Sequence, residues 1–192
     1  MSTVGWLVLV GFLALLGAVW IAFTASRLDR LHARLDAAQS ALDAQLVRRV
    51  AALRHAVEFE PAGDDPDPPA AAPVVGARVV ALSAAERAGI EAITKLALTA
   101  AGPARQDVEN EVGRAVTDLA VRGVPLSAAQ RDELHESAVR VSIARRFYND
   151  AVRDTRALRG RRMSRWLHLA GRRELPQFFD IDDTVPEQLG RS

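Results

Sequence analysis

The chain has 192 residues, of which 25 are Lys or Arg and 24 are Asp or Glu, so its formal net charge at pH 7 is +1. This balance excludes a nucleic-acid binder that depends on bulk positive charge. Only 5% of the residues are aromatic, and Ala, Leu and Arg are abundant, which favours an all-helical protein.

The N-terminal end carries the strongest single signal in the sequence. Residues 2–26 contain no charged side chain, and Gly5–Phe23 is a nearly unbroken apolar run. As a helix, this run would be about 29 Å long, close to the ~30 Å hydrocarbon core of a bilayer. Trp6 and Trp20 lie near its two ends, where aromatic rings sit at the headgroup level. We therefore predict a transmembrane anchor over residues 1–25. A cleaved signal peptide is the alternative, disfavoured because no basic residue precedes the run.

The flanking charges predict the orientation of this anchor. No Lys or Arg precedes the apolar run, whereas Arg27, Arg30 and Arg34 follow it closely. Because basic flanks stay on the cytoplasmic side, we expect a short external N-terminus and a cytoplasmic domain over residues 27–192. The absence of cysteine fits a reducing compartment. The predicted location is the cytoplasmic (inner) membrane, in a single-pass topology.

The helical pattern continues past the anchor without a breaker, and we predict a long first helix over residues 26–60, continuous with the anchor. Its apolar positions follow the 3–4 spacing of a coiled-coil seam, at Leu28, Leu31, Leu35, Ala38 and Leu42. The seam then steps by four residues, which resembles a stutter in a coiled coil. The Arg and Asp residues beside the leucines are expected to form a solvated face.

Residues 61–80 are predicted to form a Pro/Asp-rich linker. The stretch 61–76 holds five of the nine prolines and three aspartates, and proline forbids a regular helix. The remaining bundle helices are expected within residues 81–160.

Helix boundary signals divide this second region into three helices. Ser83 and Glu86 have capping-box spacing, so a second helix is predicted to begin there and to end at Gly102. A third helix is predicted over residues 104–122, with Gly123 just after its end. Ser127 and Gln130 again have capping-box spacing and open a fourth helix that continues to about residue 158. Short connections predict an all-α fold, in which a single N-terminal transmembrane helix precedes an antiparallel four-helix bundle.

Residues 161–192 are predicted to form a basic short helix followed by an acidic tail. Seven arginines and no acidic residue occur between Arg156 and Arg173. In an up-down bundle the fourth helix returns towards the membrane, where anionic headgroups attract each Arg by about 1 kcal/mol. The residues predicted to contact the membrane surface are Arg159, Arg161, Arg162, Arg165 and Trp166. Pairing with the acidic tail and a solvated basic face are the alternatives.

The motifs of common enzyme and metal sites are absent. The sequence contains no HExxH, P-loop or GxGxxG motif, and an elongated bundle offers little cleft, so we expect no enzyme and no cofactor. Two Asp-x-x-His pairs occur at opposite ends of the predicted bundle, which excludes a shared metal; these are Asp29/His32 and Asp132/His135. The acidic residues Glu109 and Glu111 are expected to lie on a helix surface.

Four segments resemble the LemA family. The sequence RRFYNDAVR at 145–153 resembles the RYNDAVR-type signature of that family, and LDAQLVRR at 42–49 is similar to its first-helix motif. The sequence DVENEV at 107–112 looks like its third-helix A-E-N-E-L element, and residues 176–180 occupy the place of its C-terminal aromatic segment. The resemblance covers most of the chain. It implies a bacterial plasma-membrane protein with a single-span anchor, a cytoplasmic helical bundle and no enzymatic activity.

The sequence departs from the family pattern at two places. Thr155 and Arg156 stand where the family commonly repeats its Tyr-Asn pair. The proline that often follows the Arg-Arg pair of the first helix is absent, and residues 50–52 read Val-Ala-Ala.

The expected function is a non-catalytic scaffold or interaction module at the membrane. The alternative is an envelope signalling protein that transmits a state change through the transmembrane helix. Expected partners are membrane lipids, a membrane or cytoplasmic protein and a second copy of the chain, but not nucleic acid. The predicted partner surface on the fourth helix consists of Arg146, Tyr148, Asn149 and Arg153. The other interpretation of Tyr148 is a packed core residue whose hydroxyl is hydrogen-bonded.

Overall fold

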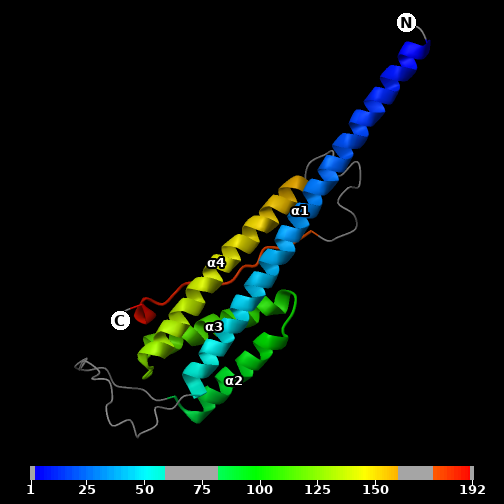
Figure 1. Cartoon of the computed structure of the whole chain (residues 1–192). Coiled ribbons are helices and arrows are strands. Elements are labelled where there is room, and N and C mark those ends of the chain that lie inside the picture. The colour runs from blue at the N-terminus through cyan, green and yellow to red at the C-terminus, as the bar shows by residue number, and fades with distance from the viewer. Residues whose placement is uncertain (1–2, 59–81, 160–174, 191–192) are drawn as a thin grey trace. The chain divides into compact units, whose positions relative to one another are not determined.

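The computed structural model describes residues 3–58, 82–159 and 175–190. Every secondary-structure element within these ranges is a helix, and residues 175–186 form a non-helical segment with no strand (Figure 1). The elements are α1 (Thr3–Glu58), α2 (Ala84–Thr99), α3 (Pro103–Val121), α4 (Ala128–Arg159) and the short 3-10 helix η1 (Glu187–Leu189). The predicted all-α fold class is confirmed. The predicted linker at 61–80 and the basic segment up to residue 174 lie outside the described residues.

Helix α1 is a single helix of 56 residues, as the unbroken pattern predicted. An 18-residue window within it has a mean hydropathy of 2.5, none of it is buried, and it is long enough to cross a membrane. Two hydroxyl side chains follow the apolar run. Thr24 Oγ1 donates to the Trp20 carbonyl and Ser26 Oγ to the Ala22 carbonyl, both at 2.9 Å. These hydroxyl groups are therefore satisfied inside the helix itself.

The capping box predicted for the second helix is confirmed at the start of α2. The Ser83 N–H donates to Glu86 Oε2 at 2.8 Å, and the Glu86 N–H donates to Ser83 Oγ at 3.3 Å. Glu86 also accepts from Arg122 Nη1 at 2.6 Å, so the end of α3 is joined to the start of α2. The Arg122 guanidinium, followed by the Ser83 donors, lowers the pKa of Glu86 from 4.5 to about 2.

The ends of α3 and the start of α4 also follow their sequence signals. Gly102 (φ 61°) and Gly123 (φ 65°) flank α3 in left-handed conformations that glycine adopts without a Cβ clash. At the start of α4, the Ser127 N–H donates to Gln130 Oε1 at 2.8 Å, and the Gln130 N–H donates to Ser127 Oγ. Gln130 Nε2 also donates to the carbonyl of His55 in the last turn of α1, at 3.3 Å.

The chain divides into two compact units, each with its own apolar cluster. Unit 1 comprises residues 1–40 and 147–178, and unit 2 comprises residues 41–146 and 179–192. In unit 1, Leu35 packs with Ala151 and Val152, and the partly buried Ala38 and Tyr148 lie against them.

The larger core lies in unit 2 and takes side chains from all four helices and from η1. Fully buried members include Leu53 of α1, Val112 of α3 and Leu134 of α4, together with Leu189 of η1. Burying an aliphatic side chain of this size contributes about 1.5–3 kcal/mol. The apolar stripe of α3 is buried here, at Val108, Val112, Val116 and Leu119.

Candidate functional site

A buried ion pair joins α1 to α3 in unit 2. The side chains of Arg49 and Glu109 are only 3% and 1% exposed. Arg49 Nη2 donates to Glu109 Oε2 at 2.7 Å and to the Glu109 carbonyl at 2.8 Å. The expectation that Glu109 lies on a helix surface is therefore wrong. Glu109 stands three residues before Val112 and seven before Val116, which places it on the buried face of α3. Glu111 is exposed and pairs with Arg114.

A second arginine extends the charge network on the same two helices. Arg105 Nη1 lies 3.2 Å from Asp43 Oδ1, and Arg105 Nε lies 4.0 Å from Glu109 Oε1. Positive and negative groups thus alternate from Asp43 through Arg105 and Glu109 to Arg49. Two of the segments that resemble LemA motifs, 42–49 and 107–112, supply three of these four residues.

The structure gives the residues of the predicted partner surface different environments. Arg146 is exposed, and Arg153 is exposed and donates to Asp150 Oδ1 at 2.6 Å. Tyr148 and Asn149 are half-buried. The Tyr148 ring packs beside the unit 1 cluster, and its hydroxyl donates to the Gln177 carbonyl at 3.0 Å. Tyr148 therefore combines packing with a hydrogen bond to the C-terminal segment.

An exposed phenylalanine on α4 was not among the predicted site residues. Phe147 is 63% exposed, although it stands inside the RRFYND motif beside Tyr148. A single exposed apolar side chain is common on a protein surface, and aromatic residues and arginine are enriched at protein interfaces. The place of Phe147 within the motif is the sequence signal that would have identified it.

The positions that depart from the family pattern have defined contacts in unit 1. Thr155 is buried, and its Oγ1 donates to the Ala151 carbonyl at 2.8 Å. The Arg156 guanidinium lies over the Phe178 ring, 5.3 Å from its centroid, in a cation–π contact. The described residues therefore use Thr155 for packing and Arg156 to hold Phe178.

The residues predicted to contact the membrane are only partly described. Trp6 and Trp20 are exposed on α1, near the two ends of the apolar run. Arg159 ends α4. Arg161, Arg162, Arg165 and Trp166 lie outside the described residues, so their contact with lipid headgroups stays a prediction.

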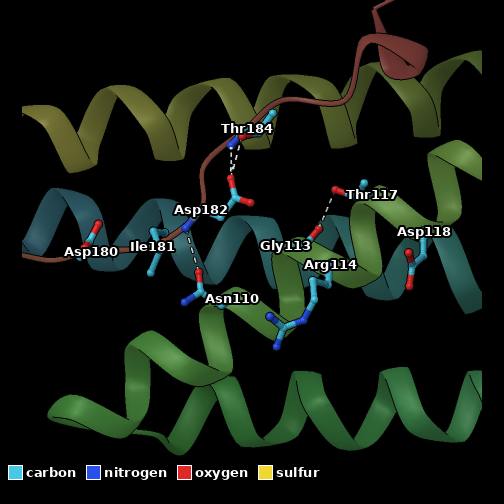
Figure 2. Close-up of a pocket in the computed structure, with 9 residues that line it drawn as sticks. All are labelled: Asn110, Gly113, Arg114, Thr117, Asp118, Asp180, Ile181, Asp182 and Thr184. Atoms are coloured by element: carbon cyan, nitrogen blue, oxygen red, sulfur yellow. Dashed lines mark hydrogen bonds between the residues drawn. The ribbon is translucent and has the colours of Figure 1, made fainter.

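The C-terminal strap, defined as residues 179–190, lies beside α3 and ends in the 3-10 helix η1. The Asp180 N–H donates to Gln106 Oε1 at 3.1 Å, and the Asp182 N–H donates to Asn110 Oδ1 at 2.8 Å. Figure 2 shows Asp182 of the strap above Asn110 of α3. Hydrogen bonds from the Thr184 hydroxyl and N–H lower the pKa of Asp182 from 3.8.

Residues of α3 and of the strap together line a hollow of about 560 Å³ (Figure 2). Its lining is polar and holds the carboxylates of Asp118, Asp180 and Asp182. No group of three or more His, Asp or Glu side chains that could hold a metal ion occurs within residues 3–58, 82–159 and 175–190.

The fold defines a class of protein: an all-helical chain with one helix that is long and apolar enough to cross a membrane. Neither a family model, nor a curated protein, nor a solved structure matches the chain.

Proposed function

We propose that this protein is a LemA-like membrane-anchored helical-bundle protein that acts as a non-catalytic scaffold at the bacterial cytoplasmic membrane. The observation that carries the proposal is the apolar window of α1, which buries none of its residues. Its exposed side chains include Leu7, Phe12 and Phe23. Each such side chain gains about 1.5–3 kcal/mol when it leaves water, so the run needs an apolar environment. A bilayer supplies that environment along the full length of the run.

The continuity of α1 favours an anchor over a cleaved signal sequence. The helix that carries the apolar run also supplies Leu46, Val50 and Leu53 to the unit 2 core. A cleaved signal peptide has an apolar region of about 7–15 residues that follows a basic segment and precedes a small-residue cleavage site, whereas no basic residue precedes the longer apolar run of α1, and the helix has no break between Thr3 and Glu58. The basic residues Arg27 and Arg30 that follow the run favour an external N-terminus and a cytoplasmic C-terminal domain.

Contacts within unit 2 support the antiparallel four-helix bundle. Arg122 at the end of α3 pairs with Glu86 at the start of α2, as expected for antiparallel neighbours. His55 at the end of α1 lies 2.8 Å from Glu133 at the start of α4, as expected for a second antiparallel pair.

The proposed partner surface lies on α4 and extends the residues predicted from the sequence. Arg146 and Arg153 offer exposed cationic groups, and Phe147 adds an exposed aromatic ring. An exposed aromatic beside arginines is the composition of energetic hot spots in protein interfaces. In this proposal, Tyr148 and Asn149 support the surface from its edge, and the partner is a membrane or cytoplasmic protein that presents acidic and apolar groups.

Membrane extraction and protease protection test the anchor. We expect the full-length protein to stay in the membrane pellet after alkaline carbonate treatment. In sealed cells, an epitope after Ser192 should resist external protease. A shortened, soluble product would identify the apolar run as a signal peptide, and a cleaved C-terminal epitope would reverse the orientation.

Cross-linking and affinity purification from native membranes test the scaffold. We expect the Arg146→Glu, Phe147→Ser variant to lose a protein that the wild type retains. Arg131→Glu, which removes another exposed arginine of α4, is the matched control and should retain that protein. Equal recovery from all three samples would contradict the proposed surface.

The continuous helix also favours a second candidate function, the transmission of a signal from the membrane. Because α1 has no break, a rotation of its apolar part moves its C-terminal part as well. An insertion of three residues after Ser26 would shift the helical phase by about 60°. A cellular response that changes with this insertion, while the protein stays in the membrane, would favour signalling over a static scaffold.

A further inference from the structure

Three arginines form one stripe on α1 directly after the apolar run. Arg27, Arg30 and Arg34 are exposed, and their spacing of three and four residues places them on one face of the helix. The acidic residues of the same segment, Asp29 and Asp36, are seven residues apart and lie on a different face. The stripe therefore faces away from the acidic side chains of its own segment.

The contacts of unit 1 give the register of α1 against α4. Arg34 Nη1 lies 3.2 Å from Asp154 Oδ2. One residue further along α1, Leu35 packs with Ala151 and Val152, which precede Asp154 on α4. The contacts thus advance along α1 while they recede along α4, as expected for antiparallel neighbours (Figure 1). Towards the apolar run, earlier residues of α1 therefore face later residues of α4.

Helix α4 supplies an acidic partner only to the stripe arginine farthest from the apolar run. The residues one turn beyond Asp154 on α4 are Ala157 and Leu158, which carry no charge. By the register above, Arg30 faces this uncharged turn. Of the three arginines of the stripe, Arg34 alone has an acidic partner among the described residues.

Helical rise gives the depth of each stripe arginine relative to the apolar run, which ends at Phe23. Arg27 and Arg30 follow Phe23 by four and seven residues, about 6 and 10 Å along the helix. Arg34 follows it by eleven residues, about 16 Å. The headgroup layer of one leaflet is roughly 5–7 Å thick, and an arginine side chain can extend its guanidinium towards that layer.

Headgroup phosphates are therefore within reach of Arg27 and Arg30 but not of Arg34. The stripe arginine that lipid cannot reach is the one that the protein pairs with an aspartate. The two arginines that lipid can reach are left to an anionic group from outside the described residues.

We propose that Arg27 and Arg30 bind the phosphate of an anionic phospholipid in the cytoplasmic leaflet, at the edge of α1 beside the end of α4. Residues three apart on a helix have Cβ atoms about 5–6 Å apart, so both guanidinium groups can donate to one phosphate. The planar donor set of arginine matches the oxygens of a phosphate group. The inference rests on the proposed membrane anchor and on its orientation.

Spin-labelled lipids measure this binding. Full-length protein is reconstituted in phosphatidylcholine vesicles that contain a trace of spin-labelled phosphatidylglycerol or, in parallel, of spin-labelled phosphatidylcholine. We expect the wild type to immobilise more of the anionic lipid. The variant Arg27→Gln, Arg30→Gln should reduce this preference by about fivefold or more, because each arginine near the surface contributes roughly a fivefold attraction.

The matched control removes the same charge further from the apolar run. Arg34→Gln, Arg48→Gln also replaces two exposed arginines of α1 and should keep the wild-type preference. Inorganic phosphate at constant ionic strength should also leave the preference unchanged, because the proposed ligand is a lipid held beside the anchor. The helical circular dichroism of every variant reports its folding.

A depth measurement reports the anchor separately, because the chain has no cysteine of its own. A fluorophore on Ser26→Cys should be quenched by lipids that carry a quencher on the headgroup, and one on Ala37→Cys should be quenched much less; both positions are exposed. Absence of quenching at both positions would overturn the anchor and this inference with it.

Three results would overturn the lipid site while the anchor stands, as shown by quenching at Ser26→Cys. The Arg27→Gln, Arg30→Gln variant could keep the wild-type preference for the anionic lipid. The control variant could lose that preference equally, which would assign it to net charge. Inorganic phosphate could abolish the preference, which would assign the two arginines to a free anion.

Discussion

Arg49 donates through one nitrogen, Nη2, to both the carboxylate and the main-chain carbonyl of Glu109, sixty residues further along the chain. Both side chains are almost fully removed from water. Buried charges of this kind are costly to desolvate, and their benefit is to select one arrangement of two helices over others. In this protein the pair joins α1 to α3 within unit 2.

Removal of one member of this pair should destabilise the protein strongly. Glu109→Ala leaves the Arg49 guanidinium buried without its carboxylate, and we expect a loss of about 3–5 kcal/mol in the free energy of unfolding. Urea unfolding of the full-length protein in detergent, followed by circular dichroism, measures this loss.

Two further variants define the cause of that loss. Glu111→Ala, on the exposed face of the same helix, should change stability by less than about 0.5 kcal/mol. The double variant Arg49→Met, Glu109→Leu removes both charges and should recover much of the stability. If Glu109→Ala were as stable as the wild type, the Arg49–Glu109 pair would not be desolvated in solution.

The size of the side chain introduced at Gly113 should decide whether the substitution stabilises the protein or displaces the strap. A Cβ atom at Gly113 would lie 3.5 Å from the Asp182 carbonyl, an ordinary contact. Gly113→Ala should therefore stabilise the protein by up to about 1 kcal/mol through its helix propensity, as should Gly89→Ala, which meets no atom within 4 Å. Gly113→Leu requires more room and should displace the strap. Limited proteolysis measures the displacement of the strap. Equal cleavage of the strap in the Gly113→Ala and Gly113→Leu variants would contradict the contact between Gly113 and Asp182.

The two amide side chains of α3 should protect the main chain of the strap from hydrogen exchange. Asn110→Leu removes the acceptor of the Asp182 N–H, and a net loss of about 0.5–1.5 kcal/mol corresponds to exchange faster by roughly 2- to 12-fold. Thr117→Val, which lines the same hollow and donates to the Gly113 carbonyl, is the control. Exchange in the strap that is unchanged by Asn110→Leu would show that the bond is not formed.

Acid should weaken the junction between α2 and α3. The pKa of Glu86 is lowered to about 2 in the folded protein, chiefly by Arg122, from 4.5. Because the folded pKa is lower than the unfolded one, the carboxylate stabilises the fold fully above about pH 4.5 and loses this effect as the pH falls towards 2. The unfolding temperature of Glu86→Gln should therefore depend less on pH over this interval than that of the wild type. If the unfolding temperatures of the wild type and of Glu86→Gln changed equally with pH, the contacts assigned to Glu86 would be contradicted.

Local signals in the sequence predicted the helices well. The capping pairs Ser83–Glu86 and Ser127–Gln130 are both present, because such caps depend on residues only three positions apart. The apolar run of α1 also needs only local information.

The long-range contacts could not be predicted in the same way. Glu109 lies on the apolar stripe of α3, but its charge suggested a surface position until the Arg49 partner was known. The sequence of the strap has no helical or strand periodicity. Its binding to unit 2 depends on Gln106, Asn110 and Arg145, which are far away in the sequence. Asp183, one of the acidic residues of the strap, pairs with an arginine of α4, and no spacing pattern in the sequence predicted this pair.

The sequence separations of these contacts also set the order in which the protein assembles during its synthesis. At roughly 5–20 residues per second, the ribosome makes Glu109 about 3–12 s after Arg49, because sixty residues separate them. The interval between the synthesis of His55 and that of Gln130 is even longer, since seventy-five residues separate them. The Glu86–Arg122 junction, at thirty-six residues, forms sooner. The apolar face of α1 therefore leaves the ribosome well before its partners exist, and the nascent chain depends on other surfaces or chaperones to protect that face until α3 and α4 arrive.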